Sequence, residues 1–352
     1  MKTQIKLHLI VNIAIAIIYI AITALLAACE NEIPYNPGKQ KTMLIMNALL
    51  NAGSTENYVI LNLSEGNNIG RLNEATLTLF VNGRVVETPQ AMTPEDIYGK
   101  FPEKSNYPPI LFKKFRLTTV LHPGDNIRLE ATAENETYRV SSEVTVPQAL
   151  ESIKVDTCLA YLRIHNQQEL CRQYKITLQD RPDERNHYRL EILNDFKFRY
   201  LNEANKERII FQQMDKLINC EDVILTDGHP SNYDDEDNGM LSTINNKYNI
   251  FTDSRFRNSS ATLNVYTPHY DDLYPTGISY KQLYRTQTIT IRLLSLTEEE
   301  YRYLKALNTL EDLGYSVLME PVRLPSNIQN GLGFVGISAE TKIIIKFPEK
   351  KL

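Results

Sequence analysis

Short runs in which apolar and polar residues alternate recur along the chain from Thr42 onward. In residues 75–81 the odd-numbered positions are apolar, whereas Thr76 and Thr78 lie between them. A period of two is typical of a half-buried β-strand. Asn82-Gly83 follows this run, and Val85-Val86 comes next. The pair predicts a tight hairpin, because both central positions of such a turn favour positive φ.

Runs of this kind predict an antiparallel β-sandwich of immunoglobulin-like type over residues 42–148. Seven or so short strands separated by turns within about 105 residues are typical of that architecture. His122-Pro123-Gly124-Asp125 predicts one of the turns. The expected strands are 43–50, 58–63, 75–81, 85–86, 115–121, 127–133 and 138–146.

A second β-rich, sandwich-like domain with one or two helices is expected over residues 149–352, after a boundary at 147–150. A weaker amphipathic pattern at 201–217 indicates a possible helix. The expected strands are 153–155, 174–178, 188–192, 260–266, 286–294 and 342–347.

One helix is clearly predicted, at residues 297–311. Thr297 and Glu300 form a capping box, in which the hydroxyl accepts from the third amide and the glutamate reaches back. Apolar side chains then recur at helical spacing, and Gly314 is expected to end the helix. These apolar residues are Tyr301, Leu304, Leu307 and Leu310.

The first 28 residues predict a secretory signal peptide that ends in a lipobox. Lys2 and Lys6 precede an apolar run at 7–25, and Leu26-Ala27-Ala28 then lead into Cys29. We expect cleavage before Cys29, which would carry a diacylglycerol anchor, with residues 29–41 as a lipidated tether. The alternative is an uncleaved helix, since 7–28 is long enough to cross a bilayer. Both alternatives place the rest of the chain outside the cytoplasm.

The balance of charged residues limits the partners that the protein is expected to bind. The chain holds 38 basic and 43 acidic side chains, and removal of Lys2 and Lys6 makes it more acidic. Nucleic acid is therefore not an expected partner, and attachment to the membrane is expected to depend on the N-terminal lipid. Glu30-Asn31-Glu32 resembles the export signal that carries lipoproteins to the cell surface in Bacteroidetes.

Three further cysteines, Cys158, Cys171 and Cys220, permit at most one internal disulfide. Cys158 and Cys171 flank a possible hairpin and are the candidate pair. Three buried free thiols are the alternative. The spacing of these cysteines does not match a zinc site.

Two polar stretches are candidate binding sites. Aromatic and acidic residues crowd 266–274 and could bind a glycan or a peptide, although packing between domains is an alternative use and the chain lacks Trp. The members of this candidate ligand surface are Tyr266, His269, Tyr270, Asp271 and Tyr274.

The second stretch resembles half of a calcium loop. Asp234, Glu236 and Asn238 alternate, but Asn245 stands where the loop needs a bidentate glutamate. A solvated acidic loop is therefore preferred, and neither a metal nor any other cofactor is expected.

No pattern of catalytic residues is evident. Residues 331–336 match G-x-G-x-x-G, but a nucleotide site needs a strand before the motif and a helix after it. Close approach of the backbone to a neighbouring element is the preferred explanation. Neither H-E-x-x-H nor G-x-S-x-G occurs, so we expect no enzyme.

Four stretches carry a family resemblance: 176–188 (ITLQDRPDERNHY), 251–256 (FTDSRF), 301–304 (YRYL) and 327–334 (NIQNGLGF). Together with the lipobox, they resemble the Bacteroidetes lipoproteins known as domain of unknown function 4249. The resemblance implies an outer-membrane lipoprotein, often encoded beside TonB-dependent transporters, without assigned catalytic residues. The polar loop 228–246 matches no fixed pattern of that family.

These observations predict a surface-exposed outer-membrane lipoprotein that binds a ligand or partner as an accessory to a TonB-dependent uptake system. The alternative is a structural β-sandwich subunit of an adhesin or fimbria.

Overall fold

The structure is a computed structural model that describes residues 41–66, 68–99, 110–164, 167–231, 246–313 and 323–352. Residues 42–352 form one compact unit. Several predicted features lie outside the described residues, namely the signal peptide with Leu26, Ala27 and Ala28, the lipidation residue Cys29, nearly all of the tether, the calcium candidates Asp234, Glu236 and Asn238, and Gly314. Among the described residues, no helix is long and apolar enough to cross a membrane.

The fold is mainly β and sandwich-like, as predicted. The two α-helices of the described residues are α2 (Pro94–Tyr98) and α3 (Glu298–Leu313), and η2 (Asp253–Arg255) is a 3-10 helix. The strands are β1 (Met43–Asn51), β2 (Asn57–Glu65), β3 (Asn68–Gly70), β4 (Ala75–Val81), β5 (Arg84–Glu87), β6 (Lys113–Leu117), β7 (Asn126–Ala133), β8 (Tyr138–Thr145), β9 (Ile153–Ile164), β10 (Gln167–Gln179), β11 (His187–Leu201), β12 (Glu207–Met214), β13 (Ile250–Thr252), β14 (Ser260–Pro268), β15 (Gln282–Leu296), β16 (Leu332–Lys346) and β17 (Lys350–Lys351).

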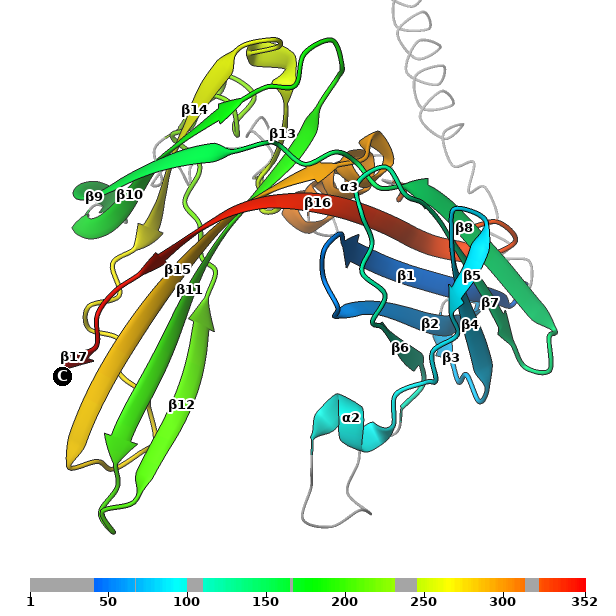
Figure 1. Cartoon of the computed structure of the whole chain (residues 1–352), viewed down its shortest axis with the longest axis horizontal. Coiled ribbons are helices and arrows are strands. Elements are labelled where there is room, and N and C mark those ends of the chain that lie inside the picture. Colours follow the sequence, from blue (N-terminus) through cyan, green and yellow to red (C-terminus); the bar gives the residue numbers. More distant parts are fainter. Residues whose placement is uncertain (1–40, 67, 100–109, 165–166, 232–245, 314–322) are drawn as a thin grey trace, which may run out of the picture. The chain divides into compact units, whose positions relative to one another are not determined.

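One ten-stranded sheet runs through both predicted domains. Its order is β12-β11-β15-β16-β1-β2-β3, with β13, β17 and β6 paired to β11, β15 and β2. The strand that joins the two parts is β16, which Figure 1 shows in red beside both β1 and β15. Its first half, from Leu332 to Ser338, pairs in parallel with β1, and Ala339 to Lys346 pair antiparallel with β15. The predicted first sandwich therefore gains a parallel strand from the far end of the sequence.

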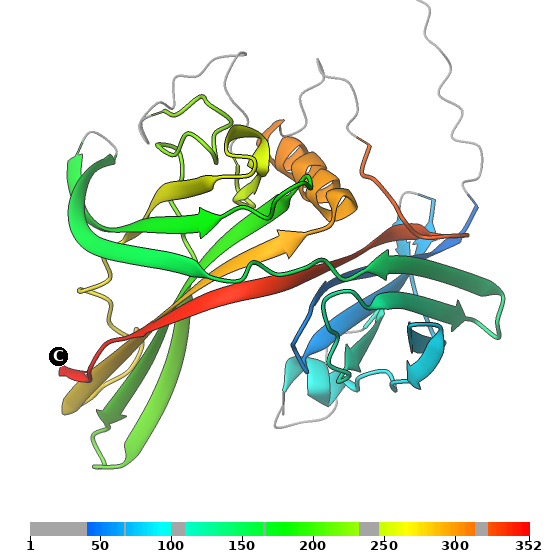
Figure 2. The same ribbon diagram turned by 45° about the horizontal axis from the view of Figure 1, so that its top comes forward.

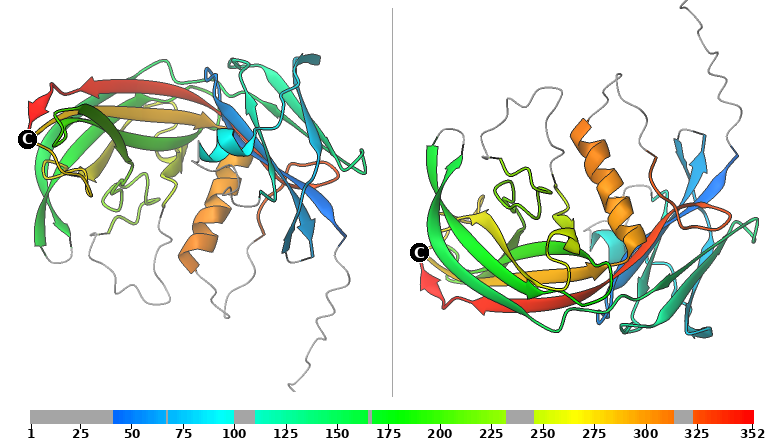
Figure 3. Two further views of the ribbon diagram at one scale, coloured as in Figure 1. Left: turned by 90° about the horizontal axis from the view of Figure 1, so that it is seen from below. Right: turned by 90° about the horizontal axis from the view of Figure 1, so that it is seen from above.

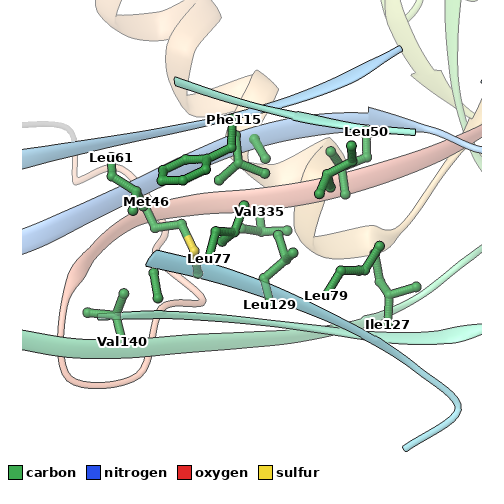
Figure 4. Close-up of a cluster of buried hydrophobic side chains, with 14 of the residues drawn as sticks. Met46, Leu50, Leu61, Leu77, Leu79, Phe115, Ile127, Leu129, Val140 and Val335 are labelled. Carbon is green, nitrogen blue, oxygen red and sulfur yellow. The ribbon is translucent and has the colours of Figure 1, made fainter. Parts of the chain in front are cut away.

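The first core lies between this sheet and a four-stranded sheet of order β5-β4-β7-β8. Figure 4 shows its side chains meeting from both layers, with Leu77 and Leu129 on one side and Met46 and Phe115 on the other. Val335 of β16 is 1% exposed in the same cluster. Residues after the predicted boundary at 147–150 thus supply part of this core.

The second core lies between the same large sheet and a three-stranded sheet of order β14-β10-β9. Tyr188, Leu190 and Ile192 project from β11 into it, and Tyr174 and Ile176 from β10 meet them. Figure 2 shows β9 and β10 passing across the part of the sheet formed by β11, β15 and β16.

The helix α3 packs on the opposite face of the large sheet. Leu293 belongs to the second core, whereas its neighbour Leu294 packs with Leu304 of the helix. Adjacent residues of a strand point to opposite faces, so the two clusters lie on different sides of the sheet. Tyr303 stacks on Phe334 with ring centroids 4.3 Å apart, which fixes the helix against β16. Figure 3 shows α3 beside β16 and close to β13.

The predicted hairpin at Asn82-Gly83 is confirmed. Both residues have positive φ, 51° and 77°, and they connect β4 to β5. The turn at 122–125 also forms, closed by a hydrogen bond from Asp125 N to His122 O. Its preceding strand ends at Leu117, earlier than predicted, because the amides of Thr118 and Thr119 donate to the Glu87 carboxylate.

The prediction of a helix within 201–217 is wrong, because this segment contains the edge strand β12. Asn202 and Asn205 form the turn that returns the chain along β11, with Asn205 at φ 58° and Lys206 N donating to the Asn202 side chain. The exposed edge of β11 then offers a partner for 207–214. The turn formed by Asn202 and Asn205, and not the spacing of apolar residues, therefore determines the conformation of this segment.

Only one of the two hydrogen bonds of the predicted capping box at α3 forms. Glu300 N donates to Thr297 Oγ at 3.1 Å, as predicted. The Glu300 side chain does not complete the box in the predicted way, because it is 2% exposed and accepts a hydrogen bond from the amide of Ile337 on β16. The residue expected to cap the helix thus ties it to the sheet.

Candidate functional site

A cavity of about 670 Å³ lies between α3, the β13–η2 segment, the start of β11 and residues 224–229. Its buried side is apolar, with Leu225, Ile250 and Phe251 each at most 5% exposed. Its outer side carries Arg185, which is exposed, together with other charged residues. A volume of this size is typical of sites for small organic ligands.

Pairing of β13 with β11 positions Asp253 at the cavity. His187 pairs with Thr252, which places the turn of η2 beside the start of β11. Asp253 is fully buried, and its Oδ2 accepts from Asn186 N at 3.0 Å. Arg257 Nε lies 3.6 Å from the same oxygen. Asp253 Oδ1 is buried without a hydrogen-bond partner among the described residues.

Gly228 and Asp227 fix the position of Arg255. The Arg255 guanidinium donates to Asp227 O at 2.5 Å. Gly228 has φ +87°, and a Cβ there would lie 2.2 Å from Arg255 Nη2. Only glycine therefore allows this arginine to lie against the turn.

The ring of His187 lies against Tyr301 of α3, with centroids 4.9 Å apart. Burial lowers the pKa of His187, and this effect exceeds the opposing influence of Glu298 and Asp253. The imidazole is therefore neutral at neutral pH and presents one donor and one acceptor. It can bind a ligand group without adding charge.

The predicted ligand surface lies elsewhere, at the far end of β14 and in the segment that follows it. His269 Nε2 lies 3.1 Å from Asp271 Oδ2, and the ring of Tyr270 packs edge-on against Phe196. Tyr274 is 45% exposed, whereas Tyr266 is only 7% exposed. Most of these side chains are engaged in packing, and the binding role remains a prediction.

A buried arginine that the sequence did not single out organises this segment. Arg285 of β15 is 5% exposed and donates to Tyr270 O, Asp271 O and Asp271 Oδ1. Burial alone would raise the pKa of Asp271, but His269 and Arg285 outweigh it and hold that pKa below its usual value.

No disulfide joins Cys158, Cys171 and Cys220 in the described part of the chain. Cys158 on β9 lies opposite Gln173, and Cys171 on β10 lies opposite Ala160, so the two cysteines do flank a hairpin. Cys158 is exposed, whereas Cys171 is fully buried beside Ile218 and Cys220. The described residues contain no group of three or more His, Cys, Asp or Glu side chains that could hold a metal ion.

The glycines of the G-x-G-x-x-G match serve close packing, as predicted. A Cβ at Gly333, where φ is +104°, would lie 2.3 Å from Met46 O. At Gly331 it would lie 2.6 Å from Leu44 O. The motif thus opens β16 against β1, and no helix follows it.

The sequence patterns did not identify the cavity as a site, although three of the four stretches that carry the family resemblance line it. Residues 176–188 supply Arg185 and His187, residues 251–256 supply Phe251 to Arg255, and residues 301–304 supply Tyr301 and Arg302. No one stretch by itself contains a recognisable pattern of binding or catalytic residues. Only the convergence of the three in space singles out the cavity.

Comparison with known proteins gives a family but no described activity. The family model "Domain of unknown function (DUF4249)" matches residues 30–344. No curated protein matches the chain. Among solved structures, a DUF4785 family protein from Legionella pneumophila is similar at a TM-score of 0.22 and 10% sequence identity, over 72% of this chain and 52% of that one. The chain thus spans about half the length of that structure.

Proposed function

We propose that this chain, which belongs to the family described as "Domain of unknown function (DUF4249)", is a lipid-anchored binding protein. In this proposal Cys29 carries the lipid, the compact unit 42–352 lies outside the cell at the outer membrane of a Bacteroidetes bacterium, and the cavity beside α3 takes the ligand. The protein serves as an accessory to a TonB-dependent transporter and does no chemistry of its own.

The observation that supports binding is the convergence of three separate sequence stretches on one cavity of about 670 Å³. The elements around it are held rigidly, because β13 pairs with β11 and α3 packs on Ile250, Leu294 and Leu296. A preformed site of this kind binds without first paying for the ordering of loops. The lipobox supports the anchor, and the short acidic stretch Glu30-Asn31-Glu32 supports surface exposure.

Expression of the full chain in a Bacteroidetes host tests the proposal. Metabolic labelling with radioactive palmitate should mark the wild-type protein and not Cys29→Ala, which should leave the membrane fraction. Cys158→Ala is the matched control, since it removes a cysteine from β9 and should leave both properties unchanged. Proteolysis of intact cells should degrade the wild-type protein, and its purification from native membranes should bring down a transporter. Membrane attachment of Cys29→Ala would contradict the anchor, and resistance to protease without a transporter would contradict the accessory role.

The structural alternative, an adhesin or fimbria subunit, is favoured by one different observation. The strand β12 is the last strand of the large sheet, and it exposes Phe211 at 76% and Ile209 at 46%. Exposed edge strands with apolar side chains can pair with another chain. This alternative predicts a ladder of oligomers on unheated gels that Phe211→Ser abolishes, whereas the binding function predicts a single band.

A further inference from the structure

The cavity beside α3 carries a charge opposite in sign to that of the whole chain. Among the described residues, its lining holds five Arg and Lys side chains against three carboxylates. The whole chain has fewer basic than acidic side chains, 38 against 43. A local excess of positive charge inside a concave site raises the concentration of anions there.

The three carboxylates are already matched by three of the cations. Asp227 pairs with Arg255 at 3.4 Å, and Asp253 with Arg257 at 3.6 Å. Glu298 pairs with Arg302 one helical turn away.

Two cations of the lining remain without such a partner. The guanidinium of Arg185, just before β11, and the ammonium of Lys305, on α3, form no hydrogen bond or ion pair with the described part of the chain. The ammonium of Lys305 lies over the ring of Tyr301, with Nζ 6.0 Å from the centroid. The unmatched positive charge of the cavity therefore resides on these two side chains, which come from different elements.

The size and the apolar wall of the cavity argue for an organic ligand. An inorganic ion would leave most of about 670 Å³ unfilled. Tyr301 offers an aromatic ring, and Leu225 and Phe251 offer buried apolar surface. A ring-sized body against this wall would place a charged substituent within reach of the outer cations.

We infer that the cavity binds an organic anion, namely a molecule with a carboxylate or phosphate group on a ring-sized body, whose charged oxygens accept from Arg185 and Lys305. The neutral imidazole of His187 provides a polar contact for an uncharged group of the same molecule. This inference rests on the proposed binding function and adds the chemical class of the ligand.

Isothermal titration calorimetry of the purified chain at low salt tests the inference. The three probes, glucuronate, glucose 6-phosphate and glucose, share the same type of sugar ring and differ in their charged group. At least one of the two anions should bind about tenfold or more tightly than glucose, because its charged oxygens accept charge-assisted hydrogen bonds that glucose cannot form. Arg185→Ala and Lys305→Ala should each weaken anion binding about tenfold, and high salt should weaken it as well. Arg84→Ala on β5 is the control with the same change of charge and should bind like wild type. The melting temperature of each variant establishes that it is folded.

Two results would overturn the inference. Equal binding of glucose and the anions, unchanged in Arg185→Ala and Lys305→Ala, would mean that the cavity selects neutral ligands, and the proposed binding function would stand. Absence of anion binding at millimolar concentration would also overturn it, and the proposed function would then be judged by the purification from native membranes alone.

Discussion

Gly336 of β16 lies directly beneath the carboxylate of Glu300, the third residue of α3. A Cβ added at Gly336 would lie 2.7 Å from Glu300 Oε2 and 3.0 Å from a methyl carbon of Leu49. This contact joins the helix to the strand that links both halves of the large sheet. The two residues are 36 positions apart, and the capping-box pattern assigned the glutamate a different role.

The first prediction uses this contact. Gly336→Ala should destabilise the protein by about 1–3 kcal/mol, the usual cost of overpacking a well-packed core. The cost should fall by about 1 kcal/mol or more when Glu300→Ala is also present, because the carboxylate that the new methyl group meets is then absent. Urea denaturation of the wild type, the two single variants and the double variant measures this coupling. An equal cost of Gly336→Ala in both backgrounds would contradict the contact.

The second prediction concerns pH. Burial raises the pKa of Glu300 from 4.5 to about 7, and Arg189 only partly opposes this. Because the folded pKa is raised, the stabilising effect of the neutral carboxyl is fully present below pH 4.5 and is lost as the pH rises through 7. Above pH 7 the buried charge should cost up to about 3 kcal/mol. Glu300→Gln should therefore be more stable than wild type at about pH 8.

The pH profile separates this effect from a general change in stability. Denaturation of Glu300→Gln and wild type at several pH values should show a difference that grows between pH 4.5 and 7 and then levels off. Glu299→Gln is the control, since that side chain is exposed. A difference independent of pH would show that the charge on Glu300 is unimportant.

Features encoded by neighbouring residues could be predicted from the sequence. Asn82-Gly83 contains the whole signal for its hairpin, and the alternation in 75–81 determines which residues of β4 are buried. The parallel pairing of β1 with β16 could not be predicted, because its contacts join residues as distant as Asn47 and Phe334. No turn signal connects such partners, and one strand alone does not specify its neighbour.

The candidate site, like the pairing of β1 with β16, depends on contacts between distant residues that the sequence did not reveal. The stretch 251–256 was singled out by resemblance, but nothing in the sequence indicates that Arg255 would lie against Gly228 or that His187 would pack against Tyr301. The crowding of aromatic residues at 266–274 pointed instead to a surface, where the structure buries Tyr266 and ties the segment to Arg285. Local composition identified unusual residues without the partners that determine their roles.

The third prediction tests why glycine stands at the start of β16. Gly333→Ala should cost about 3 kcal/mol or more, because the methyl group would meet Met46 O at 2.3 Å and φ is +104°. Gly53→Ala is the matched control, since Gly53 also has positive φ (+79°) but has no atom within 4 Å of the added Cβ. It should cost only about 1–2 kcal/mol, the strain of a left-handed residue. Equal costs in urea denaturation would mean that the approach of β16 to β1 is less close than described.

The fourth prediction distinguishes free thiols from the disulfide that the cysteine spacing permits. Cys158 is exposed, with its thiol donating to Gln173 Oε1 at 3.4 Å, whereas Cys171 is fully buried and burial raises its pKa. A maleimide should therefore modify Cys158 of the folded protein within minutes. Cys171 should react more slowly by a factor on the order of 10³ or more, because its thiol reacts only when the core opens.

Mass spectrometry of peptides from protein labelled without reductant measures both rates. Cys158→Ser should remove the fast reaction and leave the slow one, which identifies the fast site. If neither Cys158 nor Cys171 reacts in the folded protein until a reductant is added, the two thiols are joined as a disulfide. If Cys171 reacts as fast as Cys158, the cluster around Ile218 does not protect it. These outcomes distinguish a disulfide, an unprotected Cys171 and a buried Cys171. Only fast labelling of Cys158 together with slow labelling of Cys171 agrees with the packing of the β9–β10 hairpin.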